Sequence, residues 1–208
     1  MTKYINKLRK NFATDSFPVF TLTDTRVLLD SEGISRRYLK MLINHLITTK
    51  EIRRISRGVY TFHDDIAVVG FAFRPFYYGL EDALSYRNLW TQATNPVVMT
   101  TGRAREGLRK FDGANYIVKR VKPSFFFGFN FIKHYEMWLP VSDPEKTLID
   151  LVYYGHGVRD DALANLANAI DTARLDEYLK SYGKVTRKAV YSQLNKTSHD
   201  RQLPNKKE

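Results

Sequence analysis

The sequence predicts an α+β fold, and three observations support this prediction. The first 62 residues alternate helical apolar patterns with short turns and end in a β-rich stretch around a glycine. The middle of the chain mixes β-rich runs with short helical segments, and the last part is helical in pattern up to residue 196. We therefore expect an N-terminal domain of residues 1–62, a second domain of residues 63–196, and a disordered polar tail at 197–208.

Composition and charge limit the class of protein. Hydrophobic residues make up 43% of the 208 residues, as in an ordinary folded chain, and no apolar run approaches the roughly 18 residues of a membrane span. The chain has no cysteine for disulfides or thiolate metal sites, and its N-terminus lacks the apolar core of a signal peptide, so we expect a cytoplasmic protein. The net charge is +11, and residues 1–62 carry 12 Lys and Arg against 5 Asp and Glu. A basic field confined to one region is typical of a protein that binds a polyanion, with nucleic acid ahead of anionic membranes.

Two helices and a turn are expected before residue 34. Apolar side chains at helical spacing predict the first helix over Thr2–Phe12, and Phe17–Phe20 is an extended break because proline disfavours helix in the residue before it. Thr23 is an acceptable N-cap for a second helix that runs through Leu29. Ser31–Gly33 then forms a short turn, in which the glycine can adopt a left-handed conformation.

The third helix is the best-specified element of the chain. Ser35 is a good N-cap, and Ile34 before it can pack on Leu39 one turn into the helix. An apolar stripe covers one face, and the opposite face is basic. Two arginines at the start of a second helix after a short turn are typical of a recognition helix in the major groove, where arginine pairs with guanine, asparagine with adenine and lysine with phosphate. The DNA-binding residues predicted on this helix are Ser35, Arg36, Arg37, Tyr38, Lys40 and Asn44.

A hairpin is expected over Glu51–Phe62, which is rich in β-branched and aromatic residues around a glycine. Ile52 and Ile55 would face opposite sides of a regular strand, so we expect a bulge or a strong twist. Near the tip, where a wing would meet the phosphate backbone, three arginines are predicted to bind DNA: Arg53, Arg54 and Arg57. Each arginine taken alone is better explained as a solvated surface charge. The ordered set of three helices, short turn, basic helix face and basic hairpin predicts a winged helix-turn-helix that binds double-stranded DNA.

The rest of the chain predicts a mixed α/β domain with a small antiparallel sheet and C-terminal helices. Strands are expected at 96–101, 116–118 and 125–129, the last continuing through 135–139 after a turn near Lys133, with a polar connection at Gly102–Lys110. Helical segments are expected at 64–73, 80–85, 160–171, 175–182 and 186–195. Asp143 as N-cap and Pro144 as the first helical residue open one further helix.

Catalytic alternatives find little support in the sequence. Asp143–Lys146 contains the residue types of a metal-dependent nuclease, but such sites need these groups alternating on a strand, whereas the proline makes this segment a capped helix start. The five histidines lack the paired spacing of a zinc site. Gly102–Gly107 lacks the Lys-Ser/Thr of a P-loop, so its arginines are expected to contact DNA, another protein surface or solvent. Phe125–Phe131 suits sheet core better than base stacking, and we expect no enzyme activity, no cofactor and no metal.

Five segments carry a resemblance to a known family. They are Ile55–Tyr60, Tyr78–Ser85, Leu89–Gln92, Val97–Thr101 and Val141–Asp150. In order and spacing they resemble the AbiEi-type antitoxins, which come from abortive-infection toxin–antitoxin systems of bacteria and archaea. The resemblance covers roughly residues 20–155, and it rests on the series together, since short motifs such as Asp-Pro-Glu-Lys occur widely by chance.

The resemblance implies a transcriptional autoregulator that binds repeats in the promoter of its own operon. The family's partner is a nucleotidyltransferase-like toxin, which its best-known form counters without a stable protein complex. Two hypotheses stay open: a DNA-binding repressor that serves as the antitoxin of a type IV-like toxin–antitoxin operon, or an interaction module that sequesters a toxin directly, with DNA binding secondary. The C-terminal helices lie beyond the resemblance, and their expected roles are oligomerisation, DNA contacts through Arg187 and Lys188, or neutralisation of the toxin.

Overall fold

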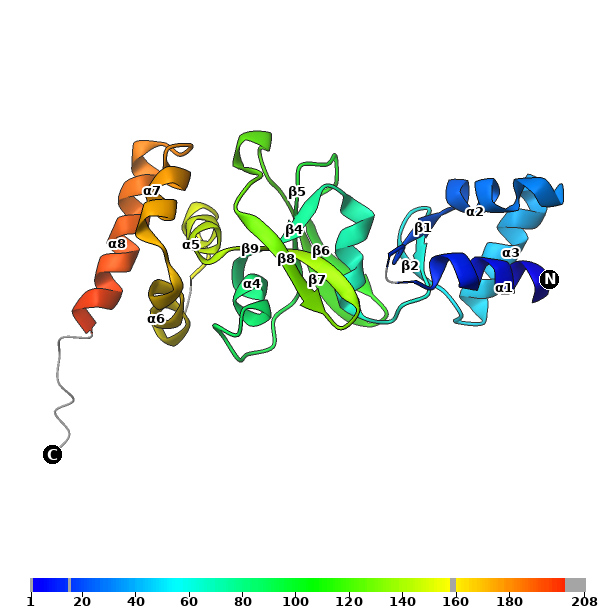
Figure 1. Cartoon of the computed structure of the whole chain (residues 1–208), viewed down its shortest axis with the longest axis horizontal. Helices are drawn as coiled ribbons and strands as arrows, with labels where there is room; N and C mark the ends of the chain where they lie inside the picture. The colour runs from blue at the N-terminus through cyan, green and yellow to red at the C-terminus, as the bar shows by residue number, and fades with distance from the viewer. Residues whose placement is uncertain (1, 15, 158–159, 201–208) are drawn as a thin grey trace, which may run out of the picture.

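The computed structural model of the protein describes residues 2–14, 16–157 and 160–200 (Figure 1). Three units follow one another along the longest axis of the molecule. Three helices and a small sheet form the N-terminal end, a six-stranded sheet forms the middle, and helices form the C-terminal end. The fold is therefore mixed α+β, as the sequence predicts.

The N-terminal unit combines three helices, a 3₁₀ turn and three strands. Its elements are α1 (Thr2–Phe12), β1 (Phe20–Thr21), α2 (Leu22–Leu29), η1 (Asp30–Glu32), α3 (Arg36–Thr48), β2 (Arg53–Ser56) and β3 (Val59–Thr61). The helices lie where the sequence predicts them, but the N-cap of α2 is Thr21 rather than Thr23. Thr21 is favoured because its hydroxyl accepts from the Asp24 amide while the Asp24 carboxylate accepts from the Thr21 amide, which is a capping box.

The strands of this unit pair antiparallel in the order β1-β3-β2, and β2 contains the expected bulge. The register shifts between Arg54 and Ser56. As a result Ile52 packs in the core of the N-terminal unit, whereas Ile55 packs in the core of the middle unit. The irregular spacing of the two isoleucines therefore reflects a hairpin that contributes to two cores.

The middle unit is built around one sheet. Its elements are η2 (Ile66–Phe73), β4 (Phe76–Tyr78), α4 (Leu80–Tyr86), β5 (Val97–Thr100), β6 (Gly107–Phe111), β7 (Ala114–Arg120), η3 (Pro123–Phe125), β8 (Phe129–His134) and β9 (Met137–Ser142). The strand order is β6-β7-β5-β4-β9-β8. The pairs β5–β7 and β4–β9 are parallel, and the other pairs are antiparallel.

The sheet differs from the predicted one in size and direction. A small antiparallel sheet is present, but in the N-terminal unit; the sheet of the middle unit has six strands and is mixed. The parallel pairs join segments that lie far apart in sequence, such as Tyr78 and Val141, and no local pattern signals them. The connection expected over Gly102–Lys110 ends early, because β6 begins at Gly107 and pairs with β7.

The phenylalanine-rich segment also differs from its prediction. Phe125–Phe127 is a 3₁₀ turn and irregular chain rather than a strand, and the turn of the β8–β9 hairpin lies at Tyr135–Glu136 rather than near Lys133. The segment leaves the sheet because its rings pack on the C-terminal helices: Phe125 stacks on Tyr182 at 4.2 Å between ring centroids. Four phenylalanines of the predicted core segment pack against the main buried cluster: Phe125, Phe126, Phe127 and Phe129. The prediction is wrong for Phe131, which is 64% exposed at the edge of the sheet.

The C-terminal unit consists of α5 (Pro144–Tyr153), α6 (Asp160–Ala169), α7 (Thr172–Leu179) and α8 (Lys184–Asp200). Asp143 is the N-cap of α5, as predicted, and α5 lies between the sheet and the other three helices (Figure 1). α8 continues to Asp200, so it extends into the segment predicted to be a tail; residues 201–208 lie outside the described part. None of the described helices is long and apolar enough to cross a membrane.

Candidate nucleic-acid interface

The exposed face of α3 is the first candidate site, and local contacts fix its orientation. The Ser35 hydroxyl accepts from the Tyr38 amide at 3.2 Å and caps the helix. The predicted apolar stripe of α3 is buried in the core of the N-terminal unit: Leu39, Leu42, Ile43 and Leu46. Because the helix repeats every 3.6 residues, the opposite face is directed to solvent.

Four polar side chains lie exposed on that face, namely Arg36, Arg37, Lys40 and Asn44. None of the four side chains forms a hydrogen bond or ion pair with another described residue. Unpaired arginine and lysine side chains keep all their donors available for an external anion. The structure thus places these four predicted residues together on one open surface.

Two acidic side chains that flank α3 in the sequence, Glu32 and Glu51, are paired with cations of α1. Glu32, in the turn before α3, binds Lys3 at 2.8 Å and Lys7 at 3.2 Å. Hydrogen bonds from Lys3 and then Lys7 hold the pKa of Glu32 below its usual range. Glu51, just after α3, pairs with Arg9. The positive charge of the α3 face is therefore not offset by these neighbouring carboxylates.

Two of the predicted α3 residues have structural partners. The ring of Tyr38 is half-buried and lies edge-on to Tyr4 of α1, at 5.8 Å between centroids. The hydroxyl of Ser35 is already engaged in the helix cap. Ser35 and Tyr38 therefore hold α3 in place, and the hydrogen-bond donors that are available to a ligand belong to the four side chains named above.

The three predicted arginines of the hairpin lie in different environments. Arg54 and Arg57 are exposed, as expected for the tip of a wing. Arg53 instead pairs with Asp112 in the β6–β7 turn, with 2.5 Å between Arg53 Nε and Asp112 Oδ2, and it lies 3.9 Å from Asp64. Its guanidinium therefore ties the hairpin to the middle unit. Sequence reasoning missed this pair because the two residues are 59 positions apart.

Sequence reasoning also missed how further arginines gather beside the hairpin tip. Arg57 lines a cavity together with Arg74 from the end of η2, Arg103 and Arg105 from the loop after β5, and Arg109 from β6. The only signal in the sequence was the pair of arginines in the Gly102–Gly107 loop. The basic surface therefore extends from the N-terminal unit onto the middle unit.

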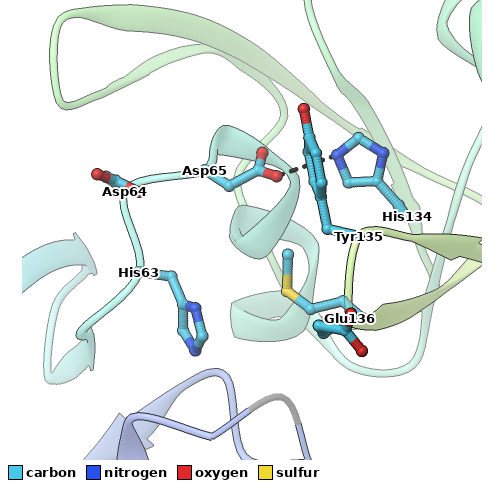
Figure 2. Close-up of a pocket in the computed structure, with 7 residues that line it drawn as sticks. His63, Asp64, Asp65, His134, Tyr135 and Glu136 are labelled. Carbon is cyan, nitrogen blue, oxygen red and sulfur yellow. Dashed lines mark hydrogen bonds and ion pairs between the residues drawn. The ribbon is translucent and has the colours of Figure 1, made fainter.

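A second pocket holds histidines and carboxylates, at the junction of the linker after β3 and the β8–β9 turn (Figure 2). His134 Nε2 lies 3.0 Å from Asp65 Oδ2, and Figure 2 shows His63 standing apart from this pair. Asp65 caps η2 through the Ala67 amide, and the His134 ring packs edge-on against Tyr135. The described residues contain no group of three or more His, Cys, Asp or Glu placed to hold a metal ion. The contact between Asp65 and His134 is best explained as a structural one that joins the linker after β3 to the β8–β9 hairpin.

The nuclease-like segment is part of the protein interior. Asp143 accepts from the Lys146 amide at 2.8 Å and from the Tyr178 hydroxyl at 2.7 Å. Glu145 accepts from the Asp171 amide at 2.6 Å, and Glu145 and Lys146 are only 1% and 0% exposed. Asp143 and Glu145 thus cap α5 and connect it to α7 through these hydrogen bonds. Because the side chains of the segment are buried, they present no surface to a substrate.

Comparisons with known proteins identify a similar fold. No protein-family model and no curated protein matches the chain. Among solved structures, the chain is similar to the crystal structure of the RV2827C protein from Mycobacterium tuberculosis, with a TM-score of 0.64 and 14% sequence identity. The match covers 94% of this chain and 77% of that one. At this identity the likeness concerns the fold alone.

Proposed function

We propose that residues 1–62 form a winged helix-turn-helix that binds double-stranded DNA. The observation that carries this proposal is the face of α3, where Arg36, Arg37, Lys40 and Asn44 are exposed and have no partner within the described chain. Charged side chains that lack intramolecular partners on a rigid, capped helix are suited to reading base edges and phosphates.

The order of elements supports the same proposal. α2 and α3 are joined by the 3₁₀ turn and Gly33, whose φ of 64° is left-handed, and the β2–β3 hairpin follows α3 directly. In this arrangement α3 enters the major groove and the hairpin contacts the flanking backbone. Arg54 and Arg57 are the hairpin arginines with exposed side chains, and they are the wing residues that we propose contact phosphates.

We further propose that the protein is a transcriptional repressor of its own operon and the antitoxin of a type IV-like toxin–antitoxin pair, acting by binding rather than by catalysis. The support is the resemblance to AbiEi-type antitoxins, whose segments are neighbours in the fold. β4 pairs with both β5 and β9, and α4 packs on α5. The segments that carry the resemblance, Tyr78–Ser85, Val97–Thr101 and Val141–Asp150, thus lie in one packed centre.

The experiment that tests DNA binding measures affinity for duplex DNA from upstream of the gene and for scrambled DNA, at several salt concentrations. An Arg36→Ala/Arg37→Ala variant is compared with Lys184→Ala/Lys196→Ala, which removes two exposed positive charges from α8. We expect the wild type to prefer the upstream DNA and the α3 variant to bind it at least tenfold more weakly, since a base-reading arginine contributes about 1–3 kcal/mol.

The control separates a specific surface from general charge. If both double variants lose affinity equally and neither DNA is preferred, the basic field acts without sequence reading and the repressor proposal fails. A neighbouring gene for a nucleotidyltransferase, and toxicity of its product relieved by this protein, would support the antitoxin part.

Direct sequestration of a toxin is the second candidate function, and one surface favours it. Phe131 and Trp138 lie on the β8–β9 hairpin at the sheet edge and are 64% and 57% exposed. Phe131 also lines an apolar groove of about 540 Å³. Under this hypothesis, Phe131→Ser/Trp138→Ser abolishes co-purification with the toxin, whereas Leu108→Ser at the opposite edge, where Leu108 is 63% exposed, has no effect. Absence of a stable complex with the wild type would exclude this function.

A further inference from the structure

The arginine-lined cavity between the hairpin tip and the middle unit has a volume of about 400 Å³. Its walls come from the hairpin tip, the end of η2, the loop after β5 and the strand β6. Each wall contributes at least one arginine: Arg57, Arg74, Arg103, Arg105 and Arg109. No carboxylate is among the described residues that line it.

These five arginines form no ion pair with a carboxylate of the described residues. Glu106, which follows Arg105 in the loop, is engaged elsewhere because its carboxylate accepts from the Arg120 amide at 2.8 Å. Arg53 lies on the same hairpin as Arg57 but differs from it, because Arg53 forms an ion pair with Asp112. Like charges held around one cavity repel one another, so an anion in that cavity would relieve the repulsion.

The floor of the cavity is held in place by hydrogen bonds. The Thr100 hydroxyl lies 2.7 Å from the Phe73 carbonyl and 2.8 Å from the Pro75 carbonyl, and its single hydrogen is shared between these two acceptors. The same hydroxyl accepts from the Gly102 amide at 2.9 Å. This one buried side chain therefore joins the end of η2 to the loop that bears Arg103 and Arg105.

One arginine of the cavity is itself oriented by neighbouring groups. The guanidinium of Arg109 lies over the Phe73 ring, 5.2 Å from its centroid, and donates to the Arg105 carbonyl at 2.5 Å. Groups fixed in this way lose little conformational entropy when a ligand binds.

We propose that this cavity binds a small free polyphosphate, of the nucleoside triphosphate class. Arginine binds phosphate oxygens through paired donors, and five arginines match a chain of several phosphates. The volume lies in the range of small-molecule sites, and Phe73 with Ala72 and Ala104 provides an apolar wall for a base or sugar. This site goes beyond the proposed function and shares with it only Arg57, which is also a proposed wing residue.

The test is a calorimetric titration of the full chain with ATP, inorganic triphosphate and adenosine, in the absence of DNA. Arg103→Ala/Arg105→Ala removes two exposed arginines of the cavity, and Lys184→Ala/Lys196→Ala is the control of equal charge on α8. We expect saturable binding of ATP that is at least tenfold weaker in the cavity variant and unchanged in the control. The comparison with inorganic triphosphate shows which part of ATP is recognised. Equal affinities for the two ligands would mean that only the phosphate chain is bound, whereas tighter binding of ATP would mean that the apolar wall also contacts the nucleoside.

Several outcomes would overturn the proposal. One is no saturable binding of ATP or triphosphate by the wild type; another is equal weakening in both double variants, which indicates unspecific charge. If the wild type does not bind ATP but the cavity variant loses affinity for duplex DNA, the arginines contact a DNA backbone instead. Arg36→Ala/Arg37→Ala should bind ATP normally, so failure of the DNA proposal and failure of this one are distinguishable.

Discussion

The surface of α3 and the interior around α5 hold charged side chains in opposite ways. On α3, Arg36, Arg37 and Lys40 are exposed and unpaired within the described chain. In α5, Lys146 is fully buried, contacts Asp150, and lies within 6 Å of the ring centroids of three aromatic residues, Tyr77, Phe127 and Tyr182. An exposed unpaired cation contributes little to stability and is free to bind a ligand, whereas a buried pair is tied to the fold.

The largest effect should come from breaking the buried pair. Lys146→Met leaves the Asp150 carboxylate buried with only the Tyr77 hydroxyl, which donates to it at 2.7 Å. We expect the free energy of unfolding to fall by about 3–5 kcal/mol, measured by denaturant titration. By comparison, Arg36→Ala and Arg37→Ala should each change it by less than about 0.5 kcal/mol.

A matched variant separates the loss of the pair from the loss of packing. In Lys146→Met/Asp150→Asn both charges are removed, and the side-chain amide carbonyl introduced at position 150 would still accept from the Tyr77 hydroxyl. This double variant should recover most of the stability lost in Lys146→Met. Equal destabilisation of the two variants would mean that the lysine stem and its aromatic neighbours, and not the charge pair, determine stability.

The backbone beside Lys146 gives the second-largest effect. Gly128 has a φ of 70°, and a Cβ there would lie 2.8 Å from both Lys146 Cβ and Tyr178 Cε2. Gly128→Ala therefore adds a steric clash to a strained backbone, and we expect a loss of about 2–4 kcal/mol in chemical unfolding. Gly113 is the control, because its φ is 88° but open space surrounds its Cβ position. Gly113→Ala should cost only about 1–2 kcal/mol, and equal costs would show that the packing around Lys146 yields.

A buried carboxyl without a cation predicts a smaller, pH-dependent effect. Burial raises the pKa of Asp82 to about 8, although the Val97 amide and the Thr94 hydroxyl partly offset this rise. Because the pKa is higher in the folded state, the group's contribution to stability is complete below about pH 4 and is lost as the pH rises toward 8. Asp82→Asn should therefore match the wild type at pH 4 and exceed it at pH 8 by about 1–3 kcal/mol in denaturant titrations. A difference that does not depend on pH would argue against this carboxyl as the titrating group.

Local signals explain which parts of the fold could be predicted from the sequence. The caps at Ser35 and Asp143 and the apolar stripe of α3 are encoded within a few residues, and those helices lie where they were expected. The exposed cations of α3 follow from the same periodicity. The bulge in β2 was also predicted, because Ile52 and Ile55 break the alternation of a regular strand.

The features that were missed depend on contacts between distant segments. The parallel pairing of Tyr78 with Val141 has no local signature, so the predicted size and direction of the middle sheet were wrong. The arginine cavity joins residues 57, 74 and 103–109, while the net charge of residues 63–150 is only +1 and concealed the cluster. The buried contact of Lys146 with Asp150 was also missed, because only the packing of α5 between sheet and helices buries it.

The smallest effect concerns Arg53, a cation of the N-terminal unit that is paired rather than open. Its partner Asp112 is half-exposed, so Arg53→Ala should lower the free energy of unfolding by only about 0.2–1 kcal/mol. The affinity of the Arg53→Ala variant for duplex DNA should stay near that of the wild type. Arg54 is the neighbouring exposed residue, and Arg54→Ala should weaken binding and reduce the slope of log affinity against log salt concentration by about 1. Denaturant titration gives the free energy of unfolding, and DNA titrations at several salt concentrations give the affinity and its salt dependence. If Arg53→Ala weakens DNA binding more than Arg54→Ala, the pair with Asp112 must open on DNA. The presence or absence of a carboxylate partner would then not identify the residues of the interface.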